Sequence, residues 1–397
     1  MLAGVHDVIV AGAGPAGSVA AMECARLGLD TVLLEKHGIP RAKCCAGGLL
    51  LRAQRRLPVP VPESLVEREI NGFAVQVGEH REEFRLPKPV GAVVKRERFD
   101  AYLAEKAKEA GSQLIEQSPV SDVVESSSGV EVQTPAGKLN ARYLIIAEGA
   151  TGRLARSIIG PYPTGSLATG VAWDVRCESD PGSSIELHLI DTPTSRVKWN
   201  RFPLNGWVFP HRNGANIGVV GQGVGGDRAR REVEKIASRL GERVGAVTVE
   251  RRSAHPLPFA PRRRLLTNRC LVVGDAAGFV NPITGEGMGY AFQGARIAAE
   301  VCFAASKEGG SGLKAYSREC EKELLRDLRA AALIGPPLQR LVGVVDTASF
   351  FRRFKEDGRL VEVCGGIARG EESWQTLARL ALVRFPSLFF GSLERPR

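Results

Sequence analysis

The chain has 397 residues, 44% of them hydrophobic and 25% charged, a composition typical of a soluble globular protein with two or three packed units. Eight cysteines are scattered without paired metal-ligand spacing, and no run of about 18 apolar residues predicts a membrane-spanning helix. The net charge of +10 suits contact with anionic lipid headgroups or a diphosphate, and no recognised nucleic-acid module accompanies it. We therefore expect a cytoplasmic protein with reduced thiols, no metal site and no nucleic-acid partner.

The first predicted elements are a strand, a helix and a second strand. The apolar run Val8-Ile9-Val10 enters the motif Gly12-Ala13-Gly14-Pro15-Ala16-Gly17, which opens a helical pattern over Ser18 to Leu27. Gly12 suits a tight turn, Gly14 lets the backbone approach a pyrophosphate, and Gly17 lets the helix pack against the sheet. The next strand, Thr31 to Leu34, ends at Glu35, where an acid can bond a ribose hydroxyl and argues against a 2′-phosphate. This unit predicts a dinucleotide site that does not hold NADPH.

A cysteine-containing loop follows, Lys43-Cys44-Cys45-Ala46-Gly47-Gly48-Leu49. The neighbouring Lys43 would favour a thiolate, which is the reactive form of cysteine. Adjacent cysteines also pack simply as small hydrophobic side chains. Beyond the loop, Phe73 to Val77 alternates like a strand and fits the start of a separate sheet.

The central elements switch from a parallel to an antiparallel pattern. We expect a helix over Arg96 to Ala110, a strand over Gly129 to Gln133 and a buried strand over Tyr143 to Ala147 that returns to the nucleotide-binding sheet. From about residue 161 to 257, alternating segments such as Ile185 to Leu189 and Asn216 to Val220 predict an antiparallel sheet.

A second glycine pattern lies inside this antiparallel stretch. Gly221-Gln222-Gly223-Val224-Gly225-Gly226 follows an apolar strand and precedes a predicted helix, Asp227 to Leu240, so it also fits a dinucleotide motif. A nicotinamide site and a plain glycine-rich connection are both compatible with it. The antiparallel neighbours favour the connection.

The third glycine pattern begins at Gly274-Asp275-Ala276-Ala277-Gly278, after the apolar run Cys270 to Val273. Asp275 can accept a hydrogen bond from a ribityl hydroxyl, and the helix start that follows can face a pyrophosphate. Gly285, Gly287 and Gly289 would let backbone N–H groups approach a flavin ring and stabilise negative charge there. With the Gly12 motif, this pattern predicts a flavin dinucleotide held at both ends of its pyrophosphate.

The C-terminal part is predicted to be helical and interrupted at Pro336-Pro337. Its last segment, Thr376 to Leu393, mixes leucines and phenylalanines with Arg379 and Arg384, a mixture that can lie in a bilayer interface. The alternative is a helix that packs on the substrate domain and is interrupted by Pro386. The first interpretation predicts salt-sensitive, peripheral contact with anionic membranes.

These motifs together resemble the geranylgeranyl reductase family of FAD-dependent oxidoreductases, which is aromatic-hydroxylase-like and has a glutathione-reductase-type FAD fold. The segments that carry the resemblance are the Gly12 motif, Lys43 to Leu49, Arg96-Glu97-Arg98-Phe99-Asp100, Ala147-Glu148-Gly149-Ala150, Trp207-Val208-Phe209-Pro210 and Gly274 to Gly289. They cover about the first 300 residues in order.

The fold implied is α/β: a Rossmann-like FAD-binding domain with a parallel sheet and helices, interleaved with an antiparallel-sheet substrate domain and followed by a C-terminal helical region. We assign residues 1–58, 90–160 and 258–330 to the FAD-binding domain, 59–89 and 161–257 to the substrate domain, and 331–397 to the helical region.

The resemblance also implies site residues. The cofactor residues that it adds to Gly12, Gly14, Gly17, Glu35 and Gly285 are Ala16, Cys45, Ala46, Gly48, Arg96, Val120, Asp275, Gly287 and Met288. The residues implied beside the reacting bond are Cys45, Trp207 and Phe209, the last two on a strand that lines a long apolar cavity in the family.

Some positions depart from the family pattern. Reductases of archaeal phospholipids tend to have Cys-Ala-Glu-Gly in the cysteine loop, whereas this chain has Gly47 in place of the Glu, as relatives acting on free diphosphates or quinones do. Asn205 replaces a Tyr, Glu148 stands where an Asp is usual, and His211 follows where a Lys is common. His211 could donate a proton near neutral pH or lie at the surface as a strand-end histidine.

The activity implied is saturation of geranylgeranyl-type prenyl double bonds, in an isoprenoid diphosphate or lipid, by hydride transfer from reduced FAD. An external electron donor, NAD(P)H or ferredoxin, would reduce the cofactor. Two alternatives remain open on the same fold: a flavin-dependent monooxygenase or hydroxylase, and an electron-transfer flavoprotein of the quinone-reductase type. The latter usually carries iron–sulfur cysteines, and no cysteine cluster of that kind occurs here.

Overall fold

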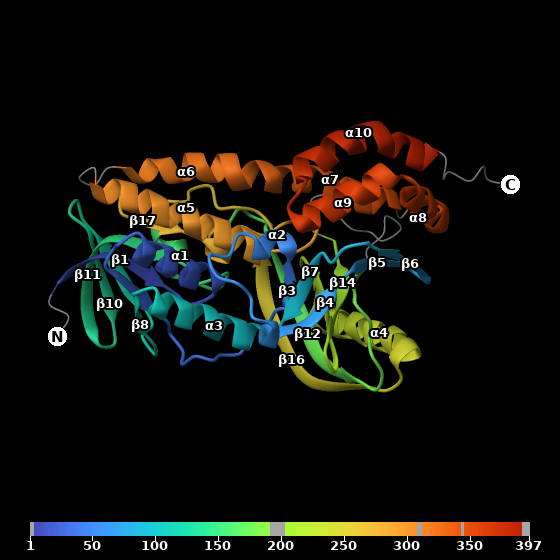
Figure 1. Ribbon diagram of the computed structural model, residues 1–397, viewed down its shortest axis with the longest axis horizontal. Coiled ribbons are helices and arrows are strands. Elements are labelled where there is room, and N and C mark those ends of the chain that lie inside the picture. Colours follow the sequence, from blue (N-terminus) through green and yellow to red (C-terminus); the bar gives the residue numbers. More distant parts are fainter. Residues whose placement is uncertain (1–3, 191–202, 308–311, 343–344, 391–397) are drawn as a thin grey trace.

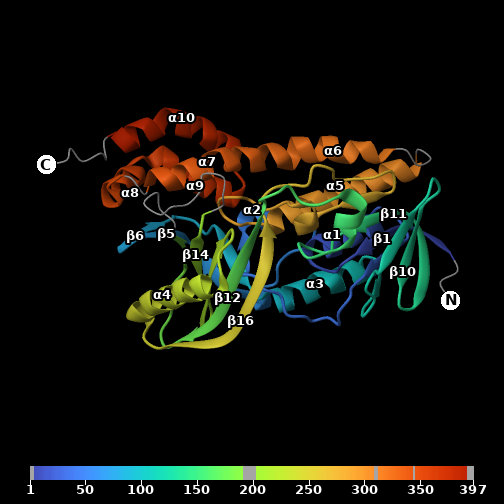
Figure 2. The same ribbon diagram turned by 180° about the vertical axis from the view of Figure 1, so that it is seen from behind.

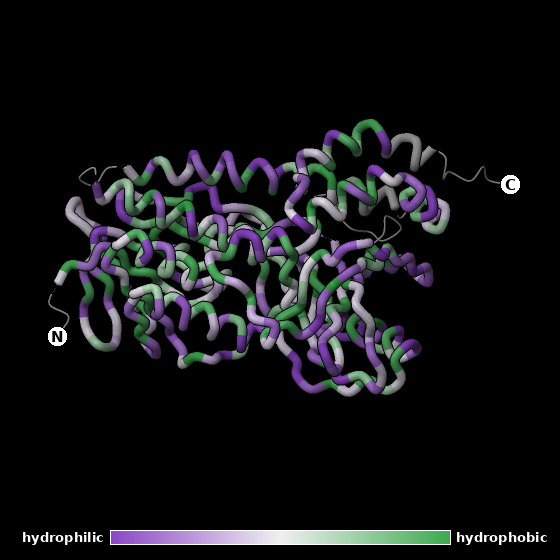
Figure 3. Tube along the Cα trace, in the orientation of Figure 1, coloured by the Kyte–Doolittle hydropathy of each residue, from purple (hydrophilic) through white to green (hydrophobic). Residues whose placement is uncertain are grey.

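A computed structural model of the protein describes residues 4–190, 203–307, 312–342 and 345–390. Of residues 336, 337, 339–342 and 385–390 it describes the backbone only. Two sheets lie next to each other along the long axis, and helices cover them from above and below (Figure 1). Hydrophobic residues gather along the interior strands and the helices packed on them (Figure 3).

The sheet nearer the N-terminus holds the predicted nucleotide-binding unit. Its parallel strands are β8 (Gln113–Ile115), β2 (Thr31–Leu34), β1 (Val5–Ala11), β11 (Gly137–Ile146) and β17 (Cys270–Val272), and β10 (Val130–Thr134) and β9 (Asp122–Glu125) add an antiparallel extension. Helix α1 (Pro15–Arg26) packs between α3 (Arg96–Glu109) and α5 (Met288–Lys307). The second halves of β1 (Val8 to Ala11) and β11 (Leu144 to Ile146) are buried on both faces and are entirely aliphatic, as expected for the centre of a parallel sheet.

The second sheet has seven strands in the order β16-β12-β15-β14-β13-β5-β6. In chain order these are β5 (Gly72–Val77), β6 (His80–Arg85), β12 (Leu167–Cys177), β13 (Ser184–Leu189), β14 (Asn205–His211), β15 (Gly214–Gly221) and β16 (Val247–Pro258). All neighbours are antiparallel except β13 and β5, which run parallel. The predicted α/β class, with a parallel and a mainly antiparallel sheet and C-terminal helices, is confirmed.

The two faces of this large sheet have different partners. Helix α4 (Gly226–Val244) covers one face through Val208, Ile217 and Val219 (Figure 2). The alternate residues point to the other side, which we call the inner face. One row of paired residues on this face crosses all seven strands: Ser253, Ala172, Gly218, Trp207, Leu187, Val75 and Glu82.

A small third sheet joins the two large ones. It consists of β3 (Gly48–Leu50), β7 (Gly91–Val94) and β4 (Val66–Ile70), with the short helix α2 (Leu51–Gln54) directly after β3. The cysteine loop therefore leads straight into a strand that lies between the nucleotide-binding sheet and the large sheet.

The C-terminal helices pack over the inner face at the β5–β6 end (Figure 1). Helix α6 (Ala315–Cys320) continues through Leu325 into α7 (Arg326–Val342), and α8 (Thr347–Glu356), α9 (Gly358–Arg369) and α10 (Trp374–Phe390) follow. None of the helices in the described ranges is both long enough and apolar enough to cross a bilayer.

The predicted helix breaks at the proline positions are wrong. Helix α7 continues through Pro336-Pro337, and α10 continues through Pro386. The fixed φ of proline is compatible with a helix, and the missing hydrogen bonds cost less than tertiary packing supplies. In α7 that packing comes from Ala331 and Ile334, which are buried in the core of the helical region.

Candidate functional site

A cleft of about 710 Å³ opens between the nucleotide-binding sheet and strand β16 of the large sheet. Nine of the predicted cofactor residues line it: Gly12, Gly14, Ala16, Glu35, Arg96, Val120, Asp275, Gly287 and Met288. Five do not: Gly17, Cys45, Ala46, Gly48 and Gly285. The size lies in the range typical of cofactor sites.

The Gly12 motif forms the turn between β1 and α1. Gly12 has φ +108°, and a Cβ there would lie 2.6 Å from the carbonyl oxygen of Ala147. A Cβ on Gly17 would lie 1.7 Å from the oxygen of Gly12, so this glycine serves helix packing and not the cleft wall. A Cβ on Gly14 would have its nearest neighbour, a nitrogen of Arg41, at 3.5 Å, so the space beside this glycine is open. Helix α1 begins directly after it, at Pro15, and its first N–H groups face the same space. This geometry fits a pyrophosphate.

An alternating chain of charges runs along one wall of the cleft. Glu35 accepts hydrogen bonds from the backbone N–H groups of Ala13, at 2.9 Å, and His37, at 3.1 Å. Arg41 lies 3.4 Å from both Glu35 and Asp100, and Asp100 accepts two hydrogen bonds from Arg96, at 2.7 and 2.9 Å. Burial lowers the pKa of Arg96, but the contacts of its guanidinium with Asp100 and with the Cys45 sulfur together outweigh burial and raise the pKa overall.

The opposite wall carries Asp275, which follows β17. Its backbone oxygen accepts a hydrogen bond from the Tyr162 hydroxyl at 2.7 Å, so the turn is fixed and the carboxylate remains directed at the cleft. A Cβ on Gly287 would lie 3.1 Å from Asp275 Oδ1, so the Gly287 backbone comes close to this carboxylate. Gly285 lies in the turn before it, where φ is +68°.

The charge of the cleft suits an anionic cofactor. Basic side chains outnumber acidic ones along its lining: the basic residues are Lys36, Arg41, Lys43, Arg96, Arg153, Arg251 and Arg252, and the acidic ones are Glu35, Glu148 and Asp275. The excess positive charge complements the two negative charges of a dinucleotide pyrophosphate. The glycine turn, the buried acid Glu35, Asp275 and this charge balance together fit FAD.

The cysteine loop reaches the cleft through Lys43 and Cys44. Lys43 Nζ lies 2.5 Å from Nε2 of His255 on β16. Burial and the charge of Lys43 lower the pKa of His255 to about 4, so its imidazole is neutral and Nε2 accepts the hydrogen bond from the ammonium group. The expected thiolate is wrong for Cys44, because burial raises the pKa of this thiol more than Lys43 lowers it.

Cys45 lies behind Cys44, next to the start of α3. Its sulfur accepts a hydrogen bond from the Gly47 N–H at 3.4 Å and lies near the Arg96 guanidinium, with which it interacts electrostatically. The loop then meets strand β14: a Cβ on Gly48 would lie 2.5 Å from Cε1 of Phe209. Cys45, Gly48 and Phe209 are thus brought together, although they are far apart in the sequence.

Trp207 lies on the inner face beside this contact. A Cβ on Gly218 would lie 2.3 Å from Trp207 Cζ2, so the indole lies flat over this glycine. Trp207 Nε1 donates to Asn216 Oδ1 at 2.8 Å, Asn216 donates to Asp174 at 2.8 Å, and Arg251 donates to the same Asp174 at 2.8 Å. This chain of hydrogen bonds fixes the plane of the indole and ends at the rim of the cofactor cleft.

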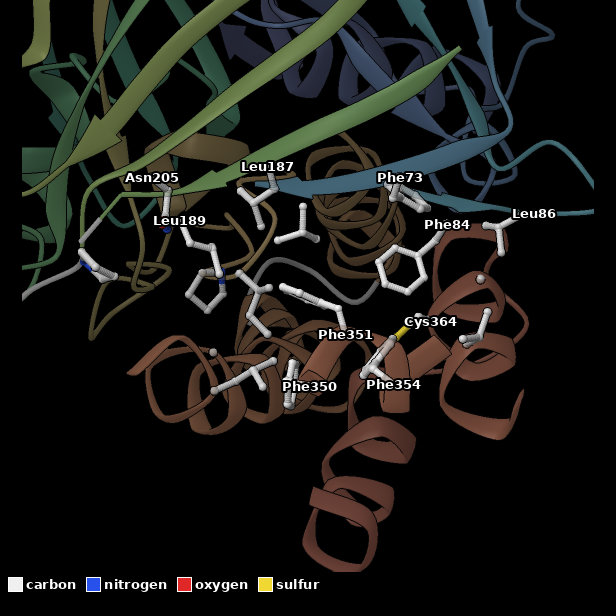
Figure 4. A pocket seen from close by; sticks show the side chains of 18 residues that line it. Phe73, Phe84, Leu86, Leu187, Leu189, Asn205, Phe350, Phe351, Phe354 and Cys364 are labelled. Carbon is white, nitrogen blue, oxygen red and sulfur yellow. The ribbon is translucent and has the colours of Figure 1, made fainter. Parts of the chain in front are cut away.

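An apolar pocket of about 250 Å³ lies farther along the inner face, beneath helices α7, α8 and α9 (Figure 4). Its lining includes Phe73, Val75, Phe84, Leu187, Leu189, Asn205, Pro282, Ile283, Phe350, Phe351, Phe354, Val361 and Cys364. Asn205 and Trp207 point to the same side of β14 because they are two residues apart. The loop 281–287 also connects the two cavities, since Pro282 and Ile283 line the pocket and Gly287 lines the cleft.

Some sequence predictions fall outside both cavities. Cys45, Trp207 and Phe209, which were predicted beside the reacting bond, line neither of them. His211 is buried, and burial lowers its pKa, but it lines neither the cleft nor the pocket. The Gly221 motif follows β15, whose neighbours β12 and β14 are antiparallel, so it is a strand-to-helix connection and not a parallel nucleotide-binding unit. Among the residues that the structure describes, no group of three or more His, Cys, Asp or Glu side chains is placed to hold a metal ion.

The structure also adds residues that the sequence did not suggest. Arg41, Asp100, His255 and Asn216 all take part in the cleft wall or in the bonds behind it. Of these four residues, only Asp100 could have been predicted from the sequence. It lies four residues after Arg96 on a predicted helix, a spacing at which two side chains can form an ion pair. His255 and Asn216 lie at strand positions that belong to no motif. Their contacts, with Lys43 and with Trp207, depend on how distant segments pair in the fold.

Comparison with known proteins agrees with this geometry. The model of the FAD binding domain family matches residues 5–326. The chain is 31% identical to digeranylgeranylglycerophospholipid reductase 2 of Methanothermobacter thermautotrophicus, covering 81% of this chain and 85% of that one. It is 30% identical to menaquinone reductase of Mycolicibacterium smegmatis, covering 74% and 76%.

Solved structures share the fold. A geranylgeranyl bacteriochlorophyll reductase-like protein of Thermoplasma acidophilum has a TM-score of 0.74 at 19% identity, covering 90% of this chain and 97% of that one. A flavin-dependent brominase has a TM-score of 0.70 at 18% identity, covering 97% and 100%, so the fold alone does not separate reductases from other flavoenzymes. The family match, the similarity to named reductases and the cleft built for FAD agree: the chain belongs to the geranylgeranyl reductase family of FAD-dependent oxidoreductases.

Proposed function

We propose that the protein saturates carbon–carbon double bonds in the prenyl chain of an isoprenoid lipid or diphosphate. Bound FAD supplies the hydride for this chemistry once an external donor has reduced it. The relatives named as reductases of geranylgeranyl groups support the proposal at modest identity. The structural observation that supports it most directly is the inner face of the large sheet, which carries both the rim of the cofactor cleft and the apolar pocket.

The chain itself would hold and orient the two reactants. The Gly12 turn and α1 would bind the pyrophosphate, Glu35 the adenosine ribose and Asp275 the ribityl chain. A prenyl chain offers little besides apolar surface, so its binding has to come from burial. The pocket beneath α7–α9 provides such a surface, with Asn205 as one of its few polar lining residues.

The roles that we propose beside the reacting bond belong to Cys45, Trp207 and Phe209. Cys45 is placed by Arg96 and Gly47, and Phe209 closes against the same loop at Gly48. Trp207 has its indole fixed by Asn216, so it can hold one isoprene unit in a constant orientation without losing side-chain entropy on binding. Together they would exclude water from the reacting carbons.

We further propose peripheral contact with membranes, where prenyl lipids reside. On α10, Leu382 is 81% exposed and Val383 73% exposed, beside the exposed Arg379 (Figure 3 shows the hydrophobic stretch). The same helix is also packed, since Trp374, Leu377 and Ala381 are buried. Residues 391–393 of the predicted membrane segment, and the side chains of Phe385 to Phe390, lie outside the described part of the chain.

Incubation of dithionite-reduced holoenzyme with prenyl substrates, followed by mass spectrometry, tests the activity without needing the natural donor. We expect products that have gained two hydrogens for each saturated double bond. Unchanged geranylgeranyl diphosphate, geranylgeranylated phospholipid and menaquinone, in the presence of fully reduced cofactor, would refute the proposed activity.

A further inference from the structure

Four phenylalanines form a cluster in the apolar pocket where helix α8 packs on strand β6. They are Phe84 on β6 and Phe350, Phe351 and Phe354 on α8, and all four line the pocket (Figure 4). Resting on the activity proposed above, we infer that this phenylalanine cluster is a length stop, which limits the prenyl chain to about four isoprene units.

The order of the strands places Phe84 on the edge of the large sheet that is opposite the cofactor cleft. The cofactor cleft touches the large sheet at β16, through residues such as His255, and β16 is one edge strand. Strand β6 is the opposite edge strand. A chain whose first unit lies at Trp207 on β14, and which continues along the inner face away from the cleft, crosses β13 and β5 and meets Phe84 last.

The rings bridge the space between the sheet and α8. The Phe84 ring lies 5.7 Å from Phe354 at 83° and 6.2 Å from Phe351 at 66°, both edge-to-face, and Phe351 lies 5.3 Å from Phe350 at 74°. Phe350 and Phe351 are almost fully buried. Edge-to-face pairs at these distances are favourable beyond simple burial, so the cluster is a fixed wall and not a set of loosely held side chains.

Polar contacts hold α8 on the sheet at the same place. Lys355 Nζ donates to Glu82 Oε1 at 2.7 Å and to the backbone oxygen of Glu83 at 3.3 Å, both on β6. At the other end of the helix, Asp346 caps the first turn by accepting from the Ser349 N–H at 2.9 Å. The helix that supplies three of the four rings is thus capped at its start and tied to β6 near its end.

The distance between Trp207 and Phe84 across the strands sets the number of isoprene units that fit between them. From β14 to β6 there are three interstrand steps, which at about 4.8 Å each span roughly 14 Å. An isoprene unit adds four bonds, or about 5 Å at the roughly 1.2 Å per bond of a fully extended chain. One unit at Trp207 therefore leaves room for about three more before Phe84.

The test measures chain-length preference in the intact holoenzyme. Calorimetry of the oxidised enzyme gives the Kd, and anaerobic turnover gives kcat/KM, for geraniol, farnesol, geranylgeraniol and geranylfarnesol, which have two to five isoprene units. For the wild type we expect affinity to rise with each unit up to geranylgeraniol and to fall for geranylfarnesol, because the fifth unit meets the cluster.

Three variants move the stop in opposite directions. Phe351→Ala opens the wall, and Phe354→Leu opens it with less risk to folding; both should bind geranylfarnesol about tenfold more tightly than the wild type does. Val75→Phe places a ring one strand earlier, on β5, and should shift the optimum from geranylgeraniol to farnesol. The matched control is Phe303→Ala on α5, which lines neither cavity and should keep the wild-type order.

The two proposals fail in different ways. If the wild type reduces neither these alcohols nor the corresponding diphosphates and geranylgeranylated lipids, the proposed function is wrong. If it reduces only the chains that carry a headgroup, the length order is measured with the diphosphates. If it reduces geranylgeraniol while Phe354→Leu and Val75→Phe, folded and loaded with FAD, keep the wild-type length order, the length stop is wrong and the proposed function stands.

Discussion

Asp275 has a position that few side chains in the protein share. It follows the buried strand β17, its own backbone oxygen is fixed by Tyr162, and its carboxylate faces the cofactor cleft beside the backbone of Gly287. A carboxylate at this point can accept a hydrogen bond from a hydroxyl of the bound cofactor. Hydrogen bonds to charged groups are worth about 1.5–3 kcal/mol.

Asp275→Ala should therefore lower FAD affinity by roughly tenfold to a hundredfold, while the fold is retained. The measurement is the flavin-to-protein ratio after dialysis, followed by titration with FAD. Asp227→Ala, at an exposed position in the first turn of α4, serves as the control. Equal flavin content in both variants would contradict the role of Asp275.

The two cysteines make different contacts, and this separates their expected effects. Cys45→Ala removes the sulfur that Arg96 and Gly47 hold, so we expect FAD to bind normally and turnover to fall about tenfold or more. Cys44→Ala removes a thiol whose pKa is raised by burial, and we expect near-normal turnover. Steady-state turnover rates of the two variants and the wild type test these expectations. Wild-type turnover in Cys45→Ala would show that Cys45 only packs in the fold.

At the scale of single residues, the sequence predicted those cleft residues whose positions depend on local spacing along the chain. Gly12, Glu35 and Asp275 lie within a few residues of strand ends, where chain geometry fixes their direction. Asn216 and His255 could not be found this way, because each acts on a residue from another strand or loop. Long-range strand register decides such contacts, and no local pattern encodes it.

At the scale of elements, the contact between Lys43 in the cysteine loop and His255 on β16 makes the stability of the fold depend on pH. The pKa of His255 is lowered to about 4 in the folded protein, from 6.5 in a free side chain, first by burial and then by Lys43. Between these two values the unfolded chain binds more protons than the folded one, so the free energy of unfolding falls as the pH falls from 6.5 toward 4. Above pH 6.5 the histidine is neutral in both states and contributes nothing to this dependence.

His255→Gln should therefore lose less Tm than the wild type as the pH is lowered through this window. Other groups that titrate in acid are common to both proteins and cancel in the comparison. His37→Gln, at an exposed position on the cleft rim, is the control and should follow the wild type. Parallel Tm curves for His255→Gln and the wild type would show that the Lys43–His255 contact does not act as described.

Helices and strands could be predicted from the sequence where their hydrophobic periodicity agrees with the observed packing. The predictions were wrong where tertiary packing stabilises a helix through residues that usually end one. The helix Arg96–Glu109 and the strands around Val8, Thr31 and Ile185 agree with their periodicity. The proline positions in α7 and α10 do not break those helices, because each helix is held by a buried face that proline leaves intact. The parallel pairing of β5 with β13 was also missed, since direction of pairing is a property of two distant segments.

On the scale of the whole molecule, the cofactor half and the helical half meet at the inner face of one sheet. The exposed part of α10 lies on the outer side of the helical half, away from the cofactor cleft (Figure 1). This arrangement would let the protein face a membrane with the same helices that cover the apolar pocket.

The double variant Leu382→Glu/Val383→Glu tests the membrane proposal without removing buried residues of α10. Both side chains are exposed, so Tm and FAD content should stay unchanged, while flotation with anionic vesicles should fall by roughly tenfold. Val124→Glu, which changes an exposed valine on β9, is the control. Added salt should weaken the flotation of the wild type, since part of the attraction is electrostatic. Equal flotation of all three proteins would clear α10 of a membrane role.

The central claim is that reduced FAD in this protein is consumed by a prenyl double bond. Mixing photoreduced holoenzyme with geranylgeranyl diphosphate or a geranylgeranylated lipid, under strict exclusion of oxygen, follows this directly through the return of the oxidised-flavin absorbance. We predict reoxidation at a rate that saturates with substrate, and one saturated double bond for each flavin reoxidised. A cofactor that stays reduced until oxygen is admitted, and then yields a hydroxylated product, would contradict the account and identify an oxygen-dependent enzyme instead.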